Sequence, residues 1–182
     1  VLLSLGGAYY ENFQFNQAEN TFNKLIRLDP NSIIAYCNLA NIELQRSNII
    51  EALKYSSKAL ELNDTSSYAN STHAVVLSRS KDIKTQKESV TYFEKAISYD
   101  PNDANSYANL AGVNFLLNEL EECKINADKA LKINPKNNIG MQNLATYYQA
   151  KGDKTKTKKL YEKILSDRPE NGGIFKDYAH HF

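Results

Sequence analysis

The 182-residue sequence contains no tryptophan, two cysteines and four prolines. No stretch reaches the roughly 18 apolar residues that a membrane-spanning helix requires, so we expect no membrane span. A formal net charge of +1 provides no general attraction to nucleic acid or to an acidic membrane. No signal-peptide pattern opens the chain, and Val1 falls inside an apolar helical pattern. We therefore expect a fragment of a longer, cytoplasmic protein, with no nucleic-acid partner.

The sequence also lacks the short motifs that carry chemistry. It has no nucleophile elbow, no phosphate-binding loop and no paired-cysteine zinc pattern. The three histidines, His73, His180 and His181, have no triad or zinc-site context, and adjacent residues on a helix face different directions. We therefore expect no enzymatic activity, no catalytic residue, no metal and no cofactor.

The spacing of the prolines is the first positive signal. Pro101, Pro135 and Pro169 follow one another at equal intervals, and Pro30 precedes Pro101 by slightly more than two such intervals. Near the middle of that long gap, Asn63 begins a stretch that resembles the other repeat ends without the proline. A fixed period of this size, about 34 residues, predicts stacked repeats. We predict one array over 1–182, with repeats at about 1–30, 31–64, 65–101, 102–135 and 136–169, and a partial sixth repeat or capping helix at 170–182.

Each repeat reads as two amphipathic helices. The first helix carries a large residue, a leucine three positions later and then a small residue, a spacing that keeps all three on one face. The second carries a small residue followed by a large one four positions later. Examples are Tyr36/Leu39/Ala40 and Tyr107/Leu110/Ala111 for the first helix, and Ala18/Phe22 for the second. In this arrangement four helices separate Cys37 from Cys123, which is too far for a disulfide.

This pattern resembles the tetratricopeptide repeat (TPR), which has W-x2-L-G-x2-Y, then A-x3-F, then P within one period. The resemblance covers essentially the whole chain. It departs at the absent tryptophan, and Glu43 and Asn114 stand where tyrosine is usual. The resemblance implies an all-α fold, a right-handed α–α superhelix of antiparallel helix pairs, acting as a non-catalytic scaffold for a protein or peptide partner.

In TPR superhelices the first helices line a concave groove, which is the candidate peptide-binding site. Asn38, Asn109 and Asn143 share one repeat position and resemble the asparagine ladder of O-linked GlcNAc transferases, whose amides can pair with a peptide backbone. The alternative is that asparagine is simply common in this sequence. Only one groove cation can be placed, so a carboxylate clamp of the chaperone-tail type is not expected. The predicted groove residues are Asn38, Asn41, Asn109, Asn143, Tyr10, Ile34, Tyr68, Arg79, Phe115, Ile139 and Gln142.

Several local features lead to further expectations. Three extra residues precede the second helix of the third repeat and predict a longer surface loop at 81–87, or alternatively a specificity loop or hinge. His73 is expected to be a hydrogen-bonded core histidine. Asn16 is expected to cap the second helix of the first repeat, with Glu19 three residues later in capping-box spacing.

The last repeat is strongly basic. Residues 151–163 contain six lysines against one aspartate and one glutamate. This segment is either a solvated outer face or a docking patch for an acidic partner or a phosphate-bearing polymer. In the tail, Phe175, Tyr178 and Phe182 recur at i, i+3 and i+7, which predicts the capping helix.

Three functions remain open on the sequence alone. The first is a peptide-binding adaptor that uses the groove. The second is a structural subunit that docks through its outer faces or C-terminal helix in a multi-subunit complex. The third is the TPR arm of a larger enzyme.

Overall fold

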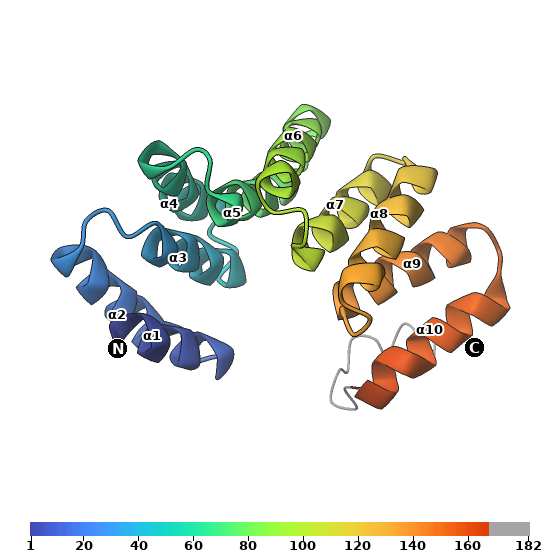
Figure 1. The fold of residues 1–182 in the computed structure, drawn as a ribbon, viewed down its shortest axis with the longest axis horizontal. Coiled ribbons are helices and arrows are strands. Elements are labelled where there is room, and N and C mark those ends of the chain that lie inside the picture. The colour runs from blue at the N-terminus through green and yellow to red at the C-terminus, as the bar shows by residue number, and fades with distance from the viewer. Residues whose placement is uncertain (168–182) are drawn as a thin grey trace. The chain divides into compact units, whose positions relative to one another are not determined.

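A computed structural model describes residues 1–167, and all the secondary structure in this range is helical (Figure 1). The predicted capping helix at 170–182, with His180 and His181, lies outside the described residues. No described helix has the length and apolar character needed to cross a membrane. The described helices are α1 (Leu2–Glu11), α2 (Phe15–Leu28), α3 (Ile33–Gln45), α4 (Ile49–Leu62), α5 (Ser67–Ser78), α6 (Ile83–Tyr99), α7 (Ala104–Leu116), α8 (Leu120–Ile133), α9 (Asn138–Ala150) and α10 (Lys154–Asp167).

The all-α prediction is confirmed, and each of the five predicted repeats contains one pair of helices joined by a short turn (Figure 1). The chain forms two compact units, and each is described by itself. The first unit, Val1–Pro101, contains α1 to α6, and the second begins at Asn102 and contains α7 to α10.

Small side chains at the contacts between helices explain the close packing within each unit. In the first unit, Ala40 of α3, Ala52 of α4 and Val76 of α5 meet in one buried cluster. In the second unit, Ala111 of α7 and Cys123 of α8 are buried in a cluster with residues of α9. Helix axes in contact lie about 8–10 Å apart, depending on the side chains at the contact, so small residues there let the helices approach closely. The repeated small residues of the sequence therefore mark where helices meet.

Helices α2, α4 and α8 each end at an Asx turn, with or without a proline. The Oδ1 atom of Asp29 accepts a hydrogen bond from the backbone N–H of Asn31 at 3.1 Å. Asn63, where the proline is missing, accepts from the N–H of Thr65 at 2.9 Å in the same way. Such a side chain satisfies the backbone two residues ahead and favours a turn. This turn explains why α4 stops at Leu62 although no proline follows.

The third repeat corrects one prediction. The extra residues do not form a longer loop, because α6 has 17 residues where α2, α4, α8 and α10 have 14. Asp82 caps this longer helix by accepting a hydrogen bond from the N–H of Thr85 at 2.9 Å. A side-chain cap satisfies an N–H group that the first helical turn leaves without a partner, so the insertion is accommodated as additional helix.

Candidate functional site

The groove residues predicted in the first unit lie on the first helices of its three repeats. Helix α3 contacts both α1 and α5, so the three helices form one face, which we call the A-helix face. Ile34 of α3 and Tyr68 of α5 are 44% and 42% exposed there. The amide Nδ2 of Asn41 lies 3.4 Å from the Tyr68 hydroxyl, so the structure brings these two predicted residues together. Tyr10 lies on α1 and is half-buried.

A pocket of about 410 Å3 opens where α3, α4 and α5 meet. We call it the α3–α5 pocket. Arg79 follows directly after α5, and it has no ion pair with another described residue. The pocket lining has no acidic side chain to neutralise this guanidinium. The lining residues are Asn41, Leu44, Gln45, Ser47, Ile49, Val75 and Arg79.

Two of these lining residues, Asn41 and Arg79, are among the groove residues predicted from the sequence, and the other five are not. Helix position alone selects residues on the face of a single helix. Leu44, Gln45 and Ser47 lie at the end of α3 and in the turn after it, and packing against α5 brings them into the pocket. Ser47 has a positive φ of +61° in this turn, and no glycine in the stretch around it could have predicted that conformation.

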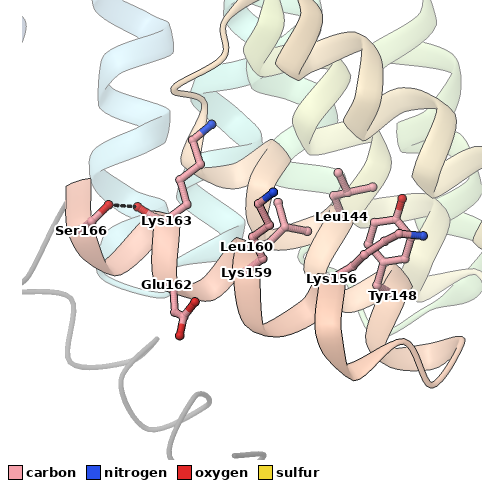
Figure 2. Close-up of a pocket in the computed structure, with 8 residues that line it drawn as sticks. All are labelled: Leu144, Tyr148, Lys156, Lys159, Leu160, Glu162, Lys163 and Ser166. Carbon is pink, nitrogen blue, oxygen red and sulfur yellow. Dashed lines mark hydrogen bonds between the residues drawn. The ribbon is translucent and has the colours of Figure 1, made fainter.

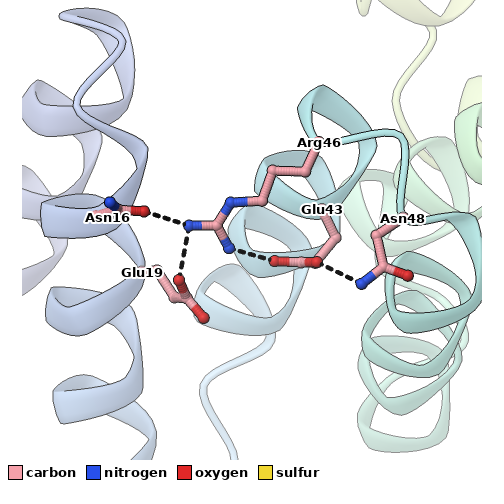
Figure 3. Close-up of polar contacts among 5 residues, drawn as sticks. All are labelled: Asn16, Glu19, Glu43, Arg46 and Asn48. Atoms are coloured by element: carbon pink, nitrogen blue, oxygen red, sulfur yellow. Dashed lines mark hydrogen bonds and ion pairs between the residues drawn. The ribbon is translucent and has the colours of Figure 1, made fainter.

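A polar network lies at the same end of α3 (Figure 3). The guanidinium of Arg46 contacts Glu19 of α2 at 2.8 Å and Glu43 of α3 at 2.7 Å, and donates to Asn16 of α2 at 2.7 Å. Asn48 donates to the second carboxylate oxygen of Glu43 at 2.8 Å. Glu43 is 6% exposed, so its charge needs these donors. The expected capping box is wrong: α2 begins at Phe15, and Asn16 and Glu19 instead bind the end of α3.

The fourth repeat uses the same contact with the residue types exchanged. Asn114, which corresponds to Glu43, donates its amide hydrogen to Glu119 at 2.8 Å. In one repeat the helix supplies the carboxylate and the turn supplies the amide, and in the other the roles are reversed. Both departures from tyrosine are therefore hydrogen-bonded polar contacts between a helix and its following turn.

In the second unit, the predicted groove residues lie on α7 and α9. The three asparagines of the predicted ladder have different surroundings. Asn143 donates to the backbone oxygen of Ala108 on the neighbouring helix at 2.8 Å, and Asn38 donates to Ile34 in its own helix at 2.8 Å. The side-chain amide of Asn109 has no hydrogen bond to another described residue. The remaining predicted residues of this unit are Phe115, Ile139 and Gln142.

A second concave surface lies between α9 and α10 (Figure 2), with a volume of about 740 Å3. We call it the α9–α10 trough. Leu144 and Tyr148 come from α9, and Leu160 comes from α10. Three lysines of α10 stand around these apolar groups. The complete lining is Leu144, Tyr148, Lys156, Lys159, Leu160, Glu162, Lys163 and Ser166.

The buried reactive groups are held in unreactive states. His73 is a core histidine as predicted: its Nδ1 lies 3.0 Å from the Ser56 hydroxyl, and its ring meets Tyr92 edge-to-face at 4.7 Å. Burial lowers the pKa of His73 to about 4, so the ring is neutral at pH 7. Burial also raises the pKa of both thiols, Cys37 and Cys123, to about 11, so neither is a nucleophile there.

Comparisons with known proteins agree with this fold. Models of the family "Tetratricopeptide repeat" match residues 1–32, 21–54 and 92–124. The human protein O-mannosyl-transferase TMTC3 is 28% identical over 156 residues, which are 85% of this chain and 17% of that protein. The chain thus spans less than a fifth of this relative's length.

Solved structures share the fold at lower identity. A thermophilic TPR protein of Thermus thermophilus has a TM-score of 0.87 at 18% identity, covering 99% of this chain and 96% of that one. YrrB, described as a TPR protein with an unusual peptide-binding site, has a TM-score of 0.61 at 16% identity, covering 97% of this chain and 89% of that one. Helix pairs, period, family models and structural neighbours all agree, and the chain is built from tetratricopeptide repeats, a fold that serves as a scaffold for protein–protein interaction.

Proposed function

We propose that this chain is a non-catalytic adaptor that binds an extended peptide segment of a protein partner, anchored in the α3–α5 pocket. One observation carries the proposal: the pocket joins a guanidinium that has no ion pair within residues 1–167, two side-chain amides and three aliphatic side chains. The cation is Arg79, and the amides belong to Asn41 and Gln45. Asn41 and Arg79 are also among the groove residues that the resemblance to TPR superhelices predicts.

The pocket chemistry suits a peptide backbone with an aliphatic side chain. A guanidinium has several N–H donors and no acceptor, and each amide adds two donors, so together they can bind the carbonyl oxygens of an extended chain. Leu44, Ile49 and Val75 offer an apolar wall for one side chain of the same peptide. A few polar groups set in apolar walls give orientation and affinity together.

The A-helix face extends the proposed site beyond the pocket. Ile34 and Tyr68 are large, exposed side chains next to Asn41, and tyrosine is enriched at interface hot spots. In the second unit, Asn109 and Gln142 supply side-chain amides on α7 and α9. We assign these residues to a separate set of peptide contacts. YrrB, which has this fold, supports the choice of a peptide as the ligand class.

The experiment begins with selection of binding peptides from a random peptide library against the full chain. The selected peptide is then titrated by fluorescence anisotropy against wild type, Arg79→Gln and Asn41→Ala. Arg27→Gln is the matched control, because Arg27 is an exposed arginine on α2, outside the pocket. Circular dichroism verifies that each variant keeps its helicity.

We expect Arg79→Gln to weaken binding about tenfold or more, because a hydrogen bond to a charged group contributes about 1.5–3 kcal/mol. Asn41→Ala should weaken it less, and Arg27→Gln should leave it unchanged. If a selected peptide binds Arg79→Gln and Asn41→Ala as tightly as wild type, the pocket assignment is wrong.

A further inference from the structure

We propose that the α9–α10 trough is a second docking site, which binds an acidic amphipathic helix of a protein partner. The site lies in the second unit and shares no residue with the α3–α5 pocket. It also gives a role to the lysine-rich segment of the last repeat.

The floor of the trough is apolar. Leu144 and Tyr148 are one turn apart on α9, and Leu160 lies on α10 (Figure 2). Leu144 is 8% exposed, whereas Tyr148 and Leu160 are half-buried. An occupant with an apolar stripe would therefore bury additional apolar area, which is the main favourable term in association.

The rim of the trough is basic. Lys156, Lys159 and Lys163 follow one another at i, i+3 and i+7, which places them on one face of α10. The ammonium group of Lys159 has no ion pair or hydrogen bond with another described residue. The single acidic residue of the lining, Glu162, pairs with Lys158 at 3.9 Å and points away from the lysine rim in Figure 2.

The other two rim lysines have weak partners that an acidic ligand can replace. Lys156 pairs with Asp153 at 3.1 Å and its ammonium lies 4.7 Å from the centre of the Tyr148 ring. Lys163 donates to the backbone oxygen of Pro135 at 3.3 Å. Exposed ion pairs such as Lys156–Asp153 contribute little to stability. Exchanging these contacts for contacts with a partner's carboxylates therefore costs little free energy.

The preceding repeat shows that such a surface accepts a helix. Helix α9 packs against both α7 and α8. Leu110 and Asn114 of α7, which stand one repeat before Leu144 and Tyr148, are 5% and 4% exposed. The last pair, α9 and α10, presents the corresponding surface.

Charge distinguishes the two surfaces and indicates the occupant. The positions that correspond to the three rim lysines are Glu122, Ile125 and Lys129 on α8, which have no net charge. Helix α9, which packs on α7 and α8 and leaves these three positions exposed, contains no charged residue. On α10 all three positions are lysine, so a complementary helix carries acidic residues beside its apolar stripe. A nucleic acid fits less well, because Tyr148 is the only aromatic group in the lining and Lys156 covers it.

The test uses the full chain and three designed fluorescent peptides. The first is helical, with leucines at i, i+3 and i+7 flanked by glutamates; the second replaces the glutamates with glutamine; the third replaces the leucines with serine. A single-stranded oligonucleotide of equal charge is the fourth probe. Each is titrated by anisotropy against wild type and against Lys159→Glu/Lys163→Glu. The control variant is Lys81→Glu/Lys84→Glu, which reverses two exposed lysines in the first unit.

We expect the first peptide to bind, and to bind at least about tenfold more weakly to Lys159→Glu/Lys163→Glu. The control variant should bind it like wild type, and the other two peptides should bind more weakly. The proposal is overturned if the first peptide does not bind the full chain, or if the lysine variant binds it equally well. It is also overturned if the oligonucleotide binds wild type as tightly as the first peptide does. The same holds if the first peptide binds only after residues 168–182 are removed, because the occupant of the trough would then be the chain's own end.

Discussion

Two adjacent glycines in α1 should respond in opposite directions to the same substitution. A Cβ atom at Gly6 would lie 2.7 Å from Cε1 and 2.8 Å from Cζ of the Phe22 ring. Favourable carbon–carbon contacts lie at about 3.5–4.0 Å, so the ring or the helix would have to move. Phe22 is fully buried in a cluster with Ala18 and Ala35, which leaves it little room. A Cβ at Gly7 would meet nothing within 4 Å.

The magnitudes follow from two terms. Replacing a helical glycine by alanine removes unfolded-state entropy and stabilises by about 0.5–1 kcal/mol. That gain applies to both positions. At Gly6 it is opposed by overpacking, which typically costs about 1–3 kcal/mol. We therefore expect Gly7→Ala to stabilise the chain and Gly6→Ala to destabilise it. Because the helix term cancels, the difference between the variants, about 1–3 kcal/mol, isolates the crowding against Phe22.

The assay is urea unfolding of the full chain, followed by circular dichroism in the far ultraviolet. Repeat arrays can unfold in stages, so the transition of the first unit is compared between variants under identical conditions. A third variant, Gly6→Ala combined with Phe22→Leu, removes the ring edge and should show a smaller cost for the alanine. If Gly6→Ala is as stable as Gly7→Ala, the close approach of α1 to Phe22 is refuted.

Two further predictions concern buried polar groups. Because the folded pKa of His73 is about 4 and the ordinary value is 6.5, its contribution to stability is complete above pH 6.5 and is lost as the pH falls toward 4. In urea unfolding, this residue should make the free energy of unfolding up to about 3 kcal/mol lower at pH 4 than at pH 7.5. The stability of His73→Asn should depend less on pH than that of wild type. An equal pH dependence in the two proteins would contradict the assignment. Arg46→Gln should lower the free energy of unfolding by about 1–3 kcal/mol, because Glu43 stays buried with fewer donors. Glu43→Gln/Arg46→Gln should recover part of that loss, and an unchanged urea midpoint in the single variant would show that the network is not stabilising.

Part of the candidate site could be predicted from helix position. Asn41 and Arg79 could be predicted because the repeats align along the chain and the resemblance to TPR superhelices implies which helix positions face the groove. Leu44, Gln45 and Val75 could not be found in this way, because they join the pocket only through contacts between helices. Whether Asn41, Arg79 and the other predicted groove residues bind a peptide stays a prediction.

The two corrections have a common cause. Asn16 and Glu19 have capping-box spacing, yet α2 begins before them and both residues bind Arg46 from the next repeat. The stretch 81–87 has the polar composition of a loop, yet a cap at Asp82 allows α6 to begin there, at Ile83. In both cases a local pattern permits more than one structure.

The sequence by itself determined the repeat period, the two helices of each repeat and the small residues at their contacts. These follow from regular spacing along one chain, and a period of about 34 residues leaves one consistent arrangement of helix pairs. The tertiary structure alone decided which polar groups find partners: Arg46 crosses from α3 to α2, Asn143 bonds the backbone of α7, and Arg79 has no ion pair among the described residues. The physical reason is that hydrogen bonds and ion pairs need atoms within about 3–4 Å, and side chains from different repeats reach that distance only when helices pack.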